Sequence, residues 1–383
     1  MFLGRIYWRW VPRTIFSGCA LASVFFFVGQ MGRINAAPDS PESNSSEQGS
    51  LLTEIAEDIK IVTIVEGLIG ARGIAVQPNG QTIFVTNSIS GEILAYDASE
   101  STRRWVAVSA PAQKDDVVAV ACLDSSAIAV LAHIKNDWFI RTHRLEPPGT
   151  SSDGALPLQT VPLKSSGTGD AQSAESSIQS VSPQENASVV PSLSVSLARN
   201  WFVICGLPPP LPSLVRGAIG GVRLGKLDAR SRSLREERPF LAIGSPREEL
   251  VLFFPLPNQD STLPEVCRLT FFTHNGAFRL LSLDTSLESV SAATFCRKTG
   301  VLWSIAGSVN STTCPRGIWR IDAALRAGEQ ITQSTCVAKM DAAKGLACLS
   351  DGSLIAICNT TPGDANTHKL VKLYVTASPQ PAP

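Results

Sequence analysis

The residue types that usually perform catalysis are present, but few occur in patterns that would let them act together. Four histidines occur in 383 residues, at positions 133, 143, 274 and 368, and no two have the four-residue spacing of a helical zinc site. The adjacent carboxylate pairs would point to opposite faces of a strand. No Gly-x-Ser-x-Gly elbow, phosphate-binding loop or calcium loop occurs. We therefore predict no metal site and no cofactor, and the catalytic residues of any enzymatic activity stay unknown.

Five polar residues, by contrast, have the chemistry to bind a small anion. Arg72 and Lys344 each precede an apolar segment, and Asn87, Asn359 and His133 each follow one. Two cations and two amides together suit a carboxylate or phosphate group. Asn also ends strands because it caps turns, and Arg and Lys are common in loops, so the same residues also fit a structural role. Whether they meet depends on the elements that carry them.

The stretch from Gly73 to Ala98 alternates short apolar segments with turn-forming residues. Ile74–Val76, Ile83–Val85 and Ile93–Tyr96 are predicted to be strands, and Pro78-Asn79-Gly80 is predicted to be a turn. Three short strands in succession make up most of one blade of a β-propeller.

The same pattern recurs along the chain with a period of ~45 residues, which is typical of propeller blades. When Gly80, Gly300 and Gly352 are aligned, Val76, Cys296 and Cys348 coincide. The sequence therefore predicts an all-β fold, a six-bladed β-propeller, with five or seven blades as alternatives. The later blades are predicted from segments 117–122 with 127–132, 193–197 with 201–205, 240–243 with 250–254, 291–296 with 301–305 and 317–321, and 345–348 with 354–358 and 369–375.

The two ends of the propeller region, 58–375, are expected to complete one blade. The tail 376–383 is rich in proline, so we expect it to be disordered and to supply no outer strand to the last blade. The alternating segment 58–65 has no partner of its own. Placed as the outer strand of the last blade, it would close the ring and remove an exposed edge.

The segments outside the blades indicate an exported protein. Arg5, Arg9 and Arg13 precede the apolar run 15–29, so we interpret residues 1–36 as a signal peptide, or else as an uncleaved anchor. Residues 37–57 are predicted to be a disordered linker, and the Ser- and Gly-rich segment 165–187 a disordered insertion. The expected location is periplasmic, secreted or at the cell surface, with membrane contact only through an uncleaved N-terminal segment. Because 33 Lys and Arg balance 33 Asp and Glu, no nucleic-acid partner is expected.

Eight cysteines follow the predicted signal peptide, and an even number in an exported protein suggests disulfides. Five of them occupy repeat-equivalent strand positions and are interpreted as small buried residues: Cys122, Cys205, Cys296, Cys348 and Cys358. Cys314 is expected in a loop of the fifth blade and Cys336 in its outer strand, so these two are the disulfide candidate.

The segment IAVQPNGQTIFVTNSISGEILAYD resembles the YVTN repeat, and the predicted ring is similar to a superfamily of six-bladed propellers. That superfamily includes NHL-repeat proteins and the SMP-30/gluconolactonase and strictosidine-synthase-like enzymes. The resemblance implies a divalent metal held by a Glu of a Glu-Gly-Pro segment in the lactonases. The nearest match is Glu66-Gly67-Leu68, which lacks the proline.

Three functions follow as expectations. The first is an exported, noncatalytic propeller that acts as a binding module for an unknown protein. The second is a metal-dependent hydrolase similar to SMP-30 and gluconolactonase, the only case in which a divalent metal is expected. The third is a small-anion binding protein that uses Arg72, Asn87, His133, Lys344 and Asn359 at the channel mouth.

Overall fold

The computed structural model describes residues 52–55, 59–98, 104–108, 116–134, 137–145, 157–163, 191–196, 201–208, 214–218, 224–225, 239–245, 249–256, 266–272, 279–323, 332–340, 342–361 and 366–375. All of them belong to one compact unit, Gln48–Pro383. The predicted signal peptide, the insertion 165–187 and the tail 376–383 lie outside the described residues. None of the described elements is a helix that could span a membrane.

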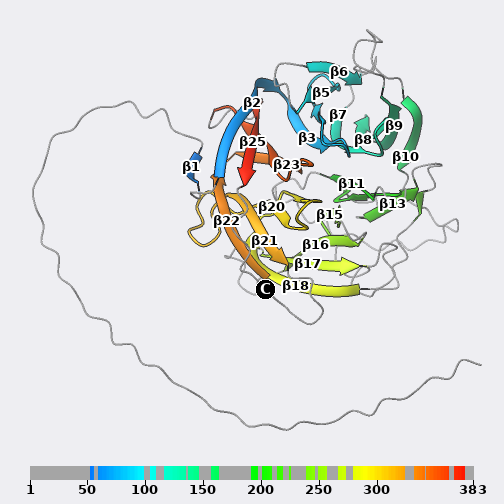
Figure 1. The fold of residues 1–383 in the computed structure, drawn as a ribbon. Helices are drawn as coiled ribbons and strands as arrows, with labels where there is room; N and C mark the ends of the chain where they lie inside the picture. Colours follow the sequence, from blue (N-terminus) through cyan, green and yellow to red (C-terminus); the bar gives the residue numbers. More distant parts are fainter. Residues whose placement is uncertain are drawn as a thin grey trace, which may run out of the picture. The chain divides into compact units, whose positions relative to one another are not determined.

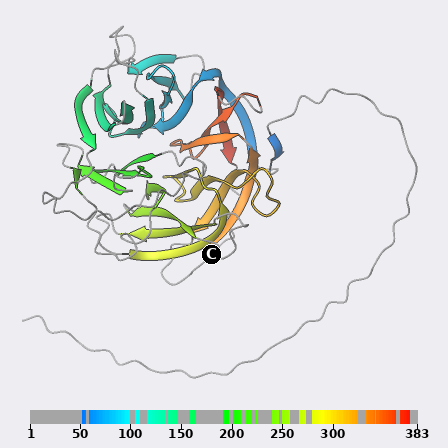
Figure 2. The same ribbon diagram turned by 180° about the vertical axis from the view of Figure 1, so that it is seen from behind.

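The described residues form β-strands and no helix, in six antiparallel sheets. Figure 1, and Figure 2 from behind, show these sheets following one another around an axis in sequence order. Each sheet is one blade, so the predicted six-bladed β-propeller is confirmed.

The blades share one plan, in which the first strand is innermost and the chain moves outward. Blade one contains β3 (Ala71–Val76), β4 (Thr82–Asn87), β5 (Ile93–Asp97) and β6 (Arg104–Val108). Blade two contains β7 (Asp116–Cys122), β8 (Ala127–Ile134), β9 (Asp137–Arg144) and β10 (Pro157–Leu163). Blade three contains β11 (Ser192–Ser196), β12 (Trp201–Cys205), β13 (Leu214–Ala218) and β14 (Leu224–Gly225).

The second half of the ring follows the same plan with two additions from the N-terminal part of the chain. Blade four contains β15 (Leu241–Gly244), β16 (Leu250–Leu256), β17 (Val266–Phe272) and β18 (Arg279–Glu288). Blade five contains β19 (Ala292–Phe295), β20 (Leu302–Ala306), β21 (Gly317–Ala323), β22 (Thr332–Met340) and the added β1 (Leu52–Ile55). Blade six contains β23 (Ala343–Cys348), β24 (Leu354–Asn359), β25 (Thr367–Val375) and the added β2 (Ile59–Ile69).

The glycines that aligned the repeats have the same backbone conformation. Gly80, Gly300 and Gly352 have φ of 75°, 72° and 92°, a left-handed conformation that glycine adopts without a steric cost. In blades one and six the glycine N–H donates to the residue three positions earlier, but Gly300 donates to Cys296, four positions earlier. The turns of blades one and five are nevertheless equally long, since Val76 pairs with Ile83 and Phe295 with Leu302. The glycine is therefore one position later in blade five, and Cys296 lies just beyond its strand.

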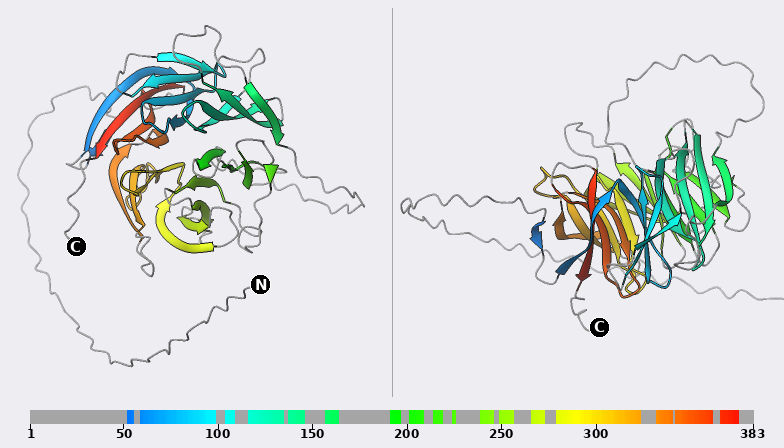
Figure 3. Two further views of the ribbon diagram at one scale, coloured as in Figure 1. Left: turned by 45° about the vertical axis from the view of Figure 1, so that its right-hand side comes forward. Right: turned by 90° about the horizontal axis from the view of Figure 1, so that it is seen from above.

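The N-terminal strand β2 closes the ring as predicted. It is antiparallel to β25, and the two strands lie side by side in Figure 1 and in both views of Figure 3. Leu68 is buried between blades six and one, and Ile64 and Val65 pack against the same cluster. Strand β2 thus pairs with β25 as the outer strand of blade six and also contributes Leu68 to the hydrophobic core.

The other N-terminal strand, β1, was not expected from the sequence. It pairs with β22 as a fifth strand of blade five, within the stretch 37–57 that was predicted to be a linker. Four residues give too short a pattern to identify a strand from sequence, and the partner lies far away in the chain.

The structure corrects the expected Cys314–Cys336 disulfide, because neither cysteine is part of a disulfide. Cys314 is in the loop between β20 and β21, and Cys336 is in β22, as predicted. The Cys314 sulfur, however, accepts a hydrogen bond from the backbone N–H of Glu288 in blade four, at 3.4 Å. It therefore faces the neighbouring blade and not the outer strand of its own.

Candidate functional site

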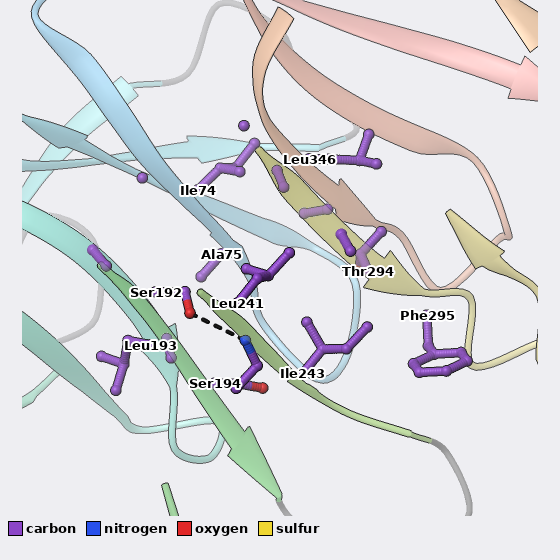
Figure 4. Close-up of a pocket in the computed structure, with 18 of the residues that line it drawn as sticks. Ile74, Ala75, Ser192, Leu193, Ser194, Leu241, Ile243, Thr294, Phe295 and Leu346 are labelled. Atoms are coloured by element: carbon purple, nitrogen blue, oxygen red, sulfur yellow. Dashed lines mark hydrogen bonds between the residues drawn. The ribbon is translucent and has the colours of Figure 1, made fainter. Parts of the chain in front are cut away.

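A cavity of about 1800 Å³ lies among the six inner strands β3, β7, β11, β15, β19 and β23. Each inner strand is the edge of its sheet, so one side of its backbone is not paired within the sheet. Figure 4 shows Ile74, Leu241, Ile243 and Leu346 around this space, contributed by three different blades. The ring therefore positions the site, and no single blade contains it.

The middle of the cavity wall is mainly aliphatic, with a small polar strip on blade three. The hydroxyl of Ser192 accepts a hydrogen bond from Ala242 N at 3.4 Å, the dashed line in Figure 4, and that of Ser194 accepts one from Gly244 N at 3.1 Å. Both bonds join blade three to blade four. Each hydroxyl hydrogen is still available to a molecule in the cavity.

Arg72 and Lys344 begin the inner strands of adjacent blades and line the same end of the cavity. The two strands lie close together there, since a Cβ atom added to Gly345 would be 3.2 Å from the carbonyl oxygen of Arg72. The structure therefore brings these two predicted residues to one mouth of the cavity.

Arg72 forms an ion pair with a carboxylate. Its guanidinium lies 3.2 Å from the Asp116 carboxylate at the start of β7, and these side chains are 48% and 41% exposed. An ion pair this exposed holds its partners weakly, so Arg72 can exchange Asp116 for another anion at little cost.

Lys344 lies against a buried histidine, which the sequence analysis did not select. The Nζ of Lys344 is 3.1 Å from Nε2 of His368, whose side chain is only 2% exposed. Asn359 is directly opposite His368 in the pairing of β24 with β25. The Oδ1 of Asn359 and the hydroxyl of Thr360 are buried and have no hydrogen-bond partner among the described residues. These two buried oxygen atoms of blade six can therefore accept hydrogen bonds from a water molecule or from a ligand.

The other predicted site residues have local roles in the structure. The Oδ1 of Asn87 accepts hydrogen bonds from Ile89 N at 3.0 Å and Ser90 N at 3.1 Å, so Asn87 caps a turn. The ring of His133 stacks on Trp138 with centroids 4.7 Å apart. Asn87, His133 and Asn359 are not among the residues that line the cavity.

Arg316 is a cation at the same mouth that sequence reasoning missed. It donates to Ser291 Oγ at 2.8 Å and to the carbonyls of Ser289 and Ala343, both at 3.1 Å. It therefore ties the entry of blade five to the start of blade six. Burial lowers its pKa from the usual value, and the nearby Cys314 acts in the opposite direction. Its position before a third strand carries no sequence signal that distinguishes it from an ordinary loop arginine.

The opposite end of the cavity is also cationic. Arg297 and Lys298 follow β19 and are exposed, and Lys298 Nζ donates to the carbonyl of Asp351 at 3.2 Å. The described residues that line the cavity include no Asp, Glu or His. The cavity thus has an apolar middle and positive charge at both ends.

The residue that the lactonase resemblance assigns to a metal lies elsewhere. Glu66 is exposed on β2, the outer strand of blade six, and it does not line the cavity. The described residues contain no cluster of three or more His, Cys, Asp or Glu that could hold a metal ion. The described side chains therefore do not fit the metal centre of that family.

No protein-family model and no curated protein matches this sequence. Among solved structures, the chain is similar to a carbohydrate-active enzyme of family AA12 from Trichoderma reesei, with 11% identity and a TM-score of 0.53 over 87% of this chain and 100% of that one. It is also similar to a glucose dehydrogenase, with 11% identity and a TM-score of 0.50 over 83% and 100%. A gluconolactonase from Xanthomonas campestris has 14% identity and a TM-score of 0.47 over 84% and 91%. At these identities the likeness shows the fold alone, which is that of a six-bladed β-propeller.

Proposed function

We propose that this propeller binds a small molecule with an apolar body and an anionic group in its central cavity. The observation that carries the proposal is the distribution of charge along the cavity, with aliphatic side chains in the middle, cations at both ends and no carboxylate among the described lining residues. Apolar surface buried in such a wall stabilises the complex by roughly 25 cal/mol per Å².

The anionic group is expected at the mouth that Arg72 and Lys344 share. Lys344 provides a second positive charge at this mouth, 3.1 Å from the imidazole of His368. Arg72 can turn from Asp116 to the ligand, since that pair is half exposed. Each charge-assisted hydrogen bond contributes about 1.5–3 kcal/mol, enough to select an acid over the corresponding alcohol.

Isothermal titration calorimetry with decanoate, decyl phosphate, decanol and acetate tests the proposal. We expect the two long-chain anions to bind, decanol to bind more weakly and acetate not to bind. Lys344→Ala should weaken decanoate binding about 10- to 100-fold, whereas Lys60→Ala, an exposed lysine on β2, should leave it unchanged. Equal affinity for decanoate and decanol, or no binding of either, would contradict the proposal.

A second candidate is an enzyme acting on a carbohydrate in the same cavity. It is supported by the names of the two similar structures, a carbohydrate-active enzyme and a glucose dehydrogenase. Its acid–base groups would have to come from outside the described lining residues. Hydrolysis of gluconolactone and oxidation of glucose, each assayed with and without added divalent metal, would separate it from a binding protein. Export from the cytoplasm and a protein partner stay predictions.

A further inference from the structure

Two cysteines from adjacent blades meet at the end of the cavity opposite Arg72 and Lys344. Cys348 is the last residue of β23, and Cys296 directly follows the last residue of β19. These inner strands are neighbours in the ring. Cys296 belongs to the apolar cluster between blades five and six, and Cys348 packs against that cluster. Cys296 is 1% exposed, whereas Cys348 is partly exposed and lines the cavity.

The sulfur of Cys296 lies beside the turn that follows Cys348, since a Cβ atom added to Gly352 in that turn would be 3.9 Å from it. The Cys348 S–H has two acceptors within reach, the Leu349 carbonyl at 3.4 Å and the sulfur of Cys296. The Cys296 sulfur also receives hydrogen bonds from the Thr299 hydroxyl and backbone and from the Lys298 backbone. Both donor residues belong to the turn that joins β19 to β20.

These contacts shift the pKa values of the two thiols in opposite directions. Burial acts to raise the pKa of Cys296, but the hydrogen bonds from Thr299, Cys348 and Lys298 together bring it below its usual value. Burial raises the pKa of Cys348, and its hydrogen bond to Cys296 raises it further. A pair of this kind has one sulfur suited to be a thiolate and one that faces the cavity.

We propose that Cys296 and Cys348 form a redox-active pair that closes to a disulfide between blades five and six. The co-reactant is a small disulfide that enters through the cavity, such as oxidised glutathione. The Cys296 thiolate takes the proton of the Cys348 S–H that donates to it, and the Cys348 sulfur attacks this disulfide and forms a mixed disulfide. The thiolate released from the small disulfide takes the proton from Cys296 and leaves as a thiol. The Cys296 thiolate then attacks the Cys348 sulfur and releases the second thiol. Two thiol hydrogens leave the protein, one S–S bond forms, and the small disulfide is reduced to two thiols.

The ring geometry explains why this pair is distinct from the similarly placed Cys122. Cys122 also ends an inner strand, β7, but the strand beside it toward blade six is β3, which ends in Val76. Cys122 thus has no cysteine at the same position in that neighbouring blade. Burial raises the pKa of the Cys122 thiol as it raises that of Cys348, so the two differ in the presence of a neighbouring thiol and not in acidity.

Mass spectrometry of the full chain after treatment with oxidised glutathione and then iodoacetamide tests the proposal. We expect one new bond that joins the peptides containing Cys296 and Cys348, and a loss of two alkylatable thiols. The oxidised protein should melt about 5 °C above the reduced protein, because the bond closes a long loop in the unfolded chain.

Three variants check the order of the steps. Cys296→Ser should trap a glutathione adduct on Cys348, since no resolving thiol is left, and Cys348→Ser should give no adduct at this site. Cys122→Ser is the matched control and should still form the bridge. A bond elsewhere, such as Cys267 to Cys314, or full alkylation of Cys296 and Cys348 after oxidation, would overturn the proposal. The wild-type peptide map decides the question even where a variant does not fold.

Discussion

Ile61 on β2 lies directly opposite Leu373 on β25, so the second and the last strand of the described chain belong to one sheet. A ring closed in this way has no unpaired strand at the seam between its first and last blades. Ile61 also packs on the cluster that contains Leu373, so the closure contributes both backbone hydrogen bonds and apolar contacts.

Removal of β2 should therefore open the ring. A chain that begins at Gly70 should aggregate or lose its cooperative thermal transition, because the edge of β25 and the apolar residues beneath β2 become exposed. A chain that begins at Gln48, where the compact unit starts, is the control and should melt like the full protein. If both truncated chains melt alike, β2 is not needed for closure.

Arg316→Ala should destabilise the junction of blades five and six by about 2–4 kcal/mol. The substitution removes donors from the carbonyls of Ser289 and Ala343 and from the Ser291 hydroxyl. Denaturant unfolding measures the loss. Arg72→Ala is the control and should cost less than about 1 kcal/mol, since its ion pair with Asp116 is half exposed. Equal losses in the two variants would contradict this assignment.

Gly307→Ala should be among the most damaging single substitutions in the ring. Gly307 has φ of 92°, and an added Cβ would collide with the carbonyl oxygens of Cys314 and Pro315. We expect a loss of about 3 kcal/mol or more. Gly300→Ala is the matched control, because it has a similar φ of 72° but nothing within 4 Å of the added atom. It should cost only about 1–2 kcal/mol, the strain of a left-handed alanine.

Asp351 should contribute a small part of the stability that is lost in acid. Burial acts to raise its pKa, but hydrogen bonds from Ser353 and from Lys372 Nζ, the latter at 3.0 Å, bring it below the ordinary value of 3.8. A carboxyl group whose folded pKa is lowered stabilises the fold above pH 3.8, and this contribution disappears as the pH falls further. The side chain is 53% exposed, so we expect less than about 1 kcal/mol.

Asp351→Asn tests this pH dependence. The variant should be slightly less stable than the wild type at pH 7 and equally stable near pH 2. Denaturant unfolding at both values measures the difference. A deficit that persists unchanged in acid would show that the asparagine disturbs the turn and that the charge is not responsible.

The repeat pattern was sufficient to predict the blades because each blade is a local unit. Gly80, Gly300 and Gly352 adopt a turn conformation that glycine favours, and the apolar segments beside them form the inner strands. The closure by β2 was also predictable, since an alternating segment without a partner faced a last blade without an outer strand. The strand β1 was not predictable, because four residues carry no periodicity.

The candidate site was harder to predict because its residues belong to different blades. The alignment of the repeats predicted that Arg72 and Lys344 lie near each other, and both line the cavity. Asn87, however, caps its own turn, and His133 stacks on Trp138. His368 and Arg316 reach that region from other strands and carry no repeat signature. The glycine alignment matched Cys296 to Val76, but in the strand pairing Phe295 takes that position, because the glycine is one position later in blade five.

The sequence by itself therefore determined the class of fold, the number of blades and the way the ring closes, since these depend on local turn chemistry and on strand periodicity. Only the tertiary structure decided which side chains meet. Arg72 meets Asp116, Lys344 meets His368, Cys314 faces Glu288, and Cys296 meets Cys348. Each contact except that of Lys344 with His368 joins two blades, and packing between blades is set by the ring as a whole, because a blade buries its faces only against its neighbours.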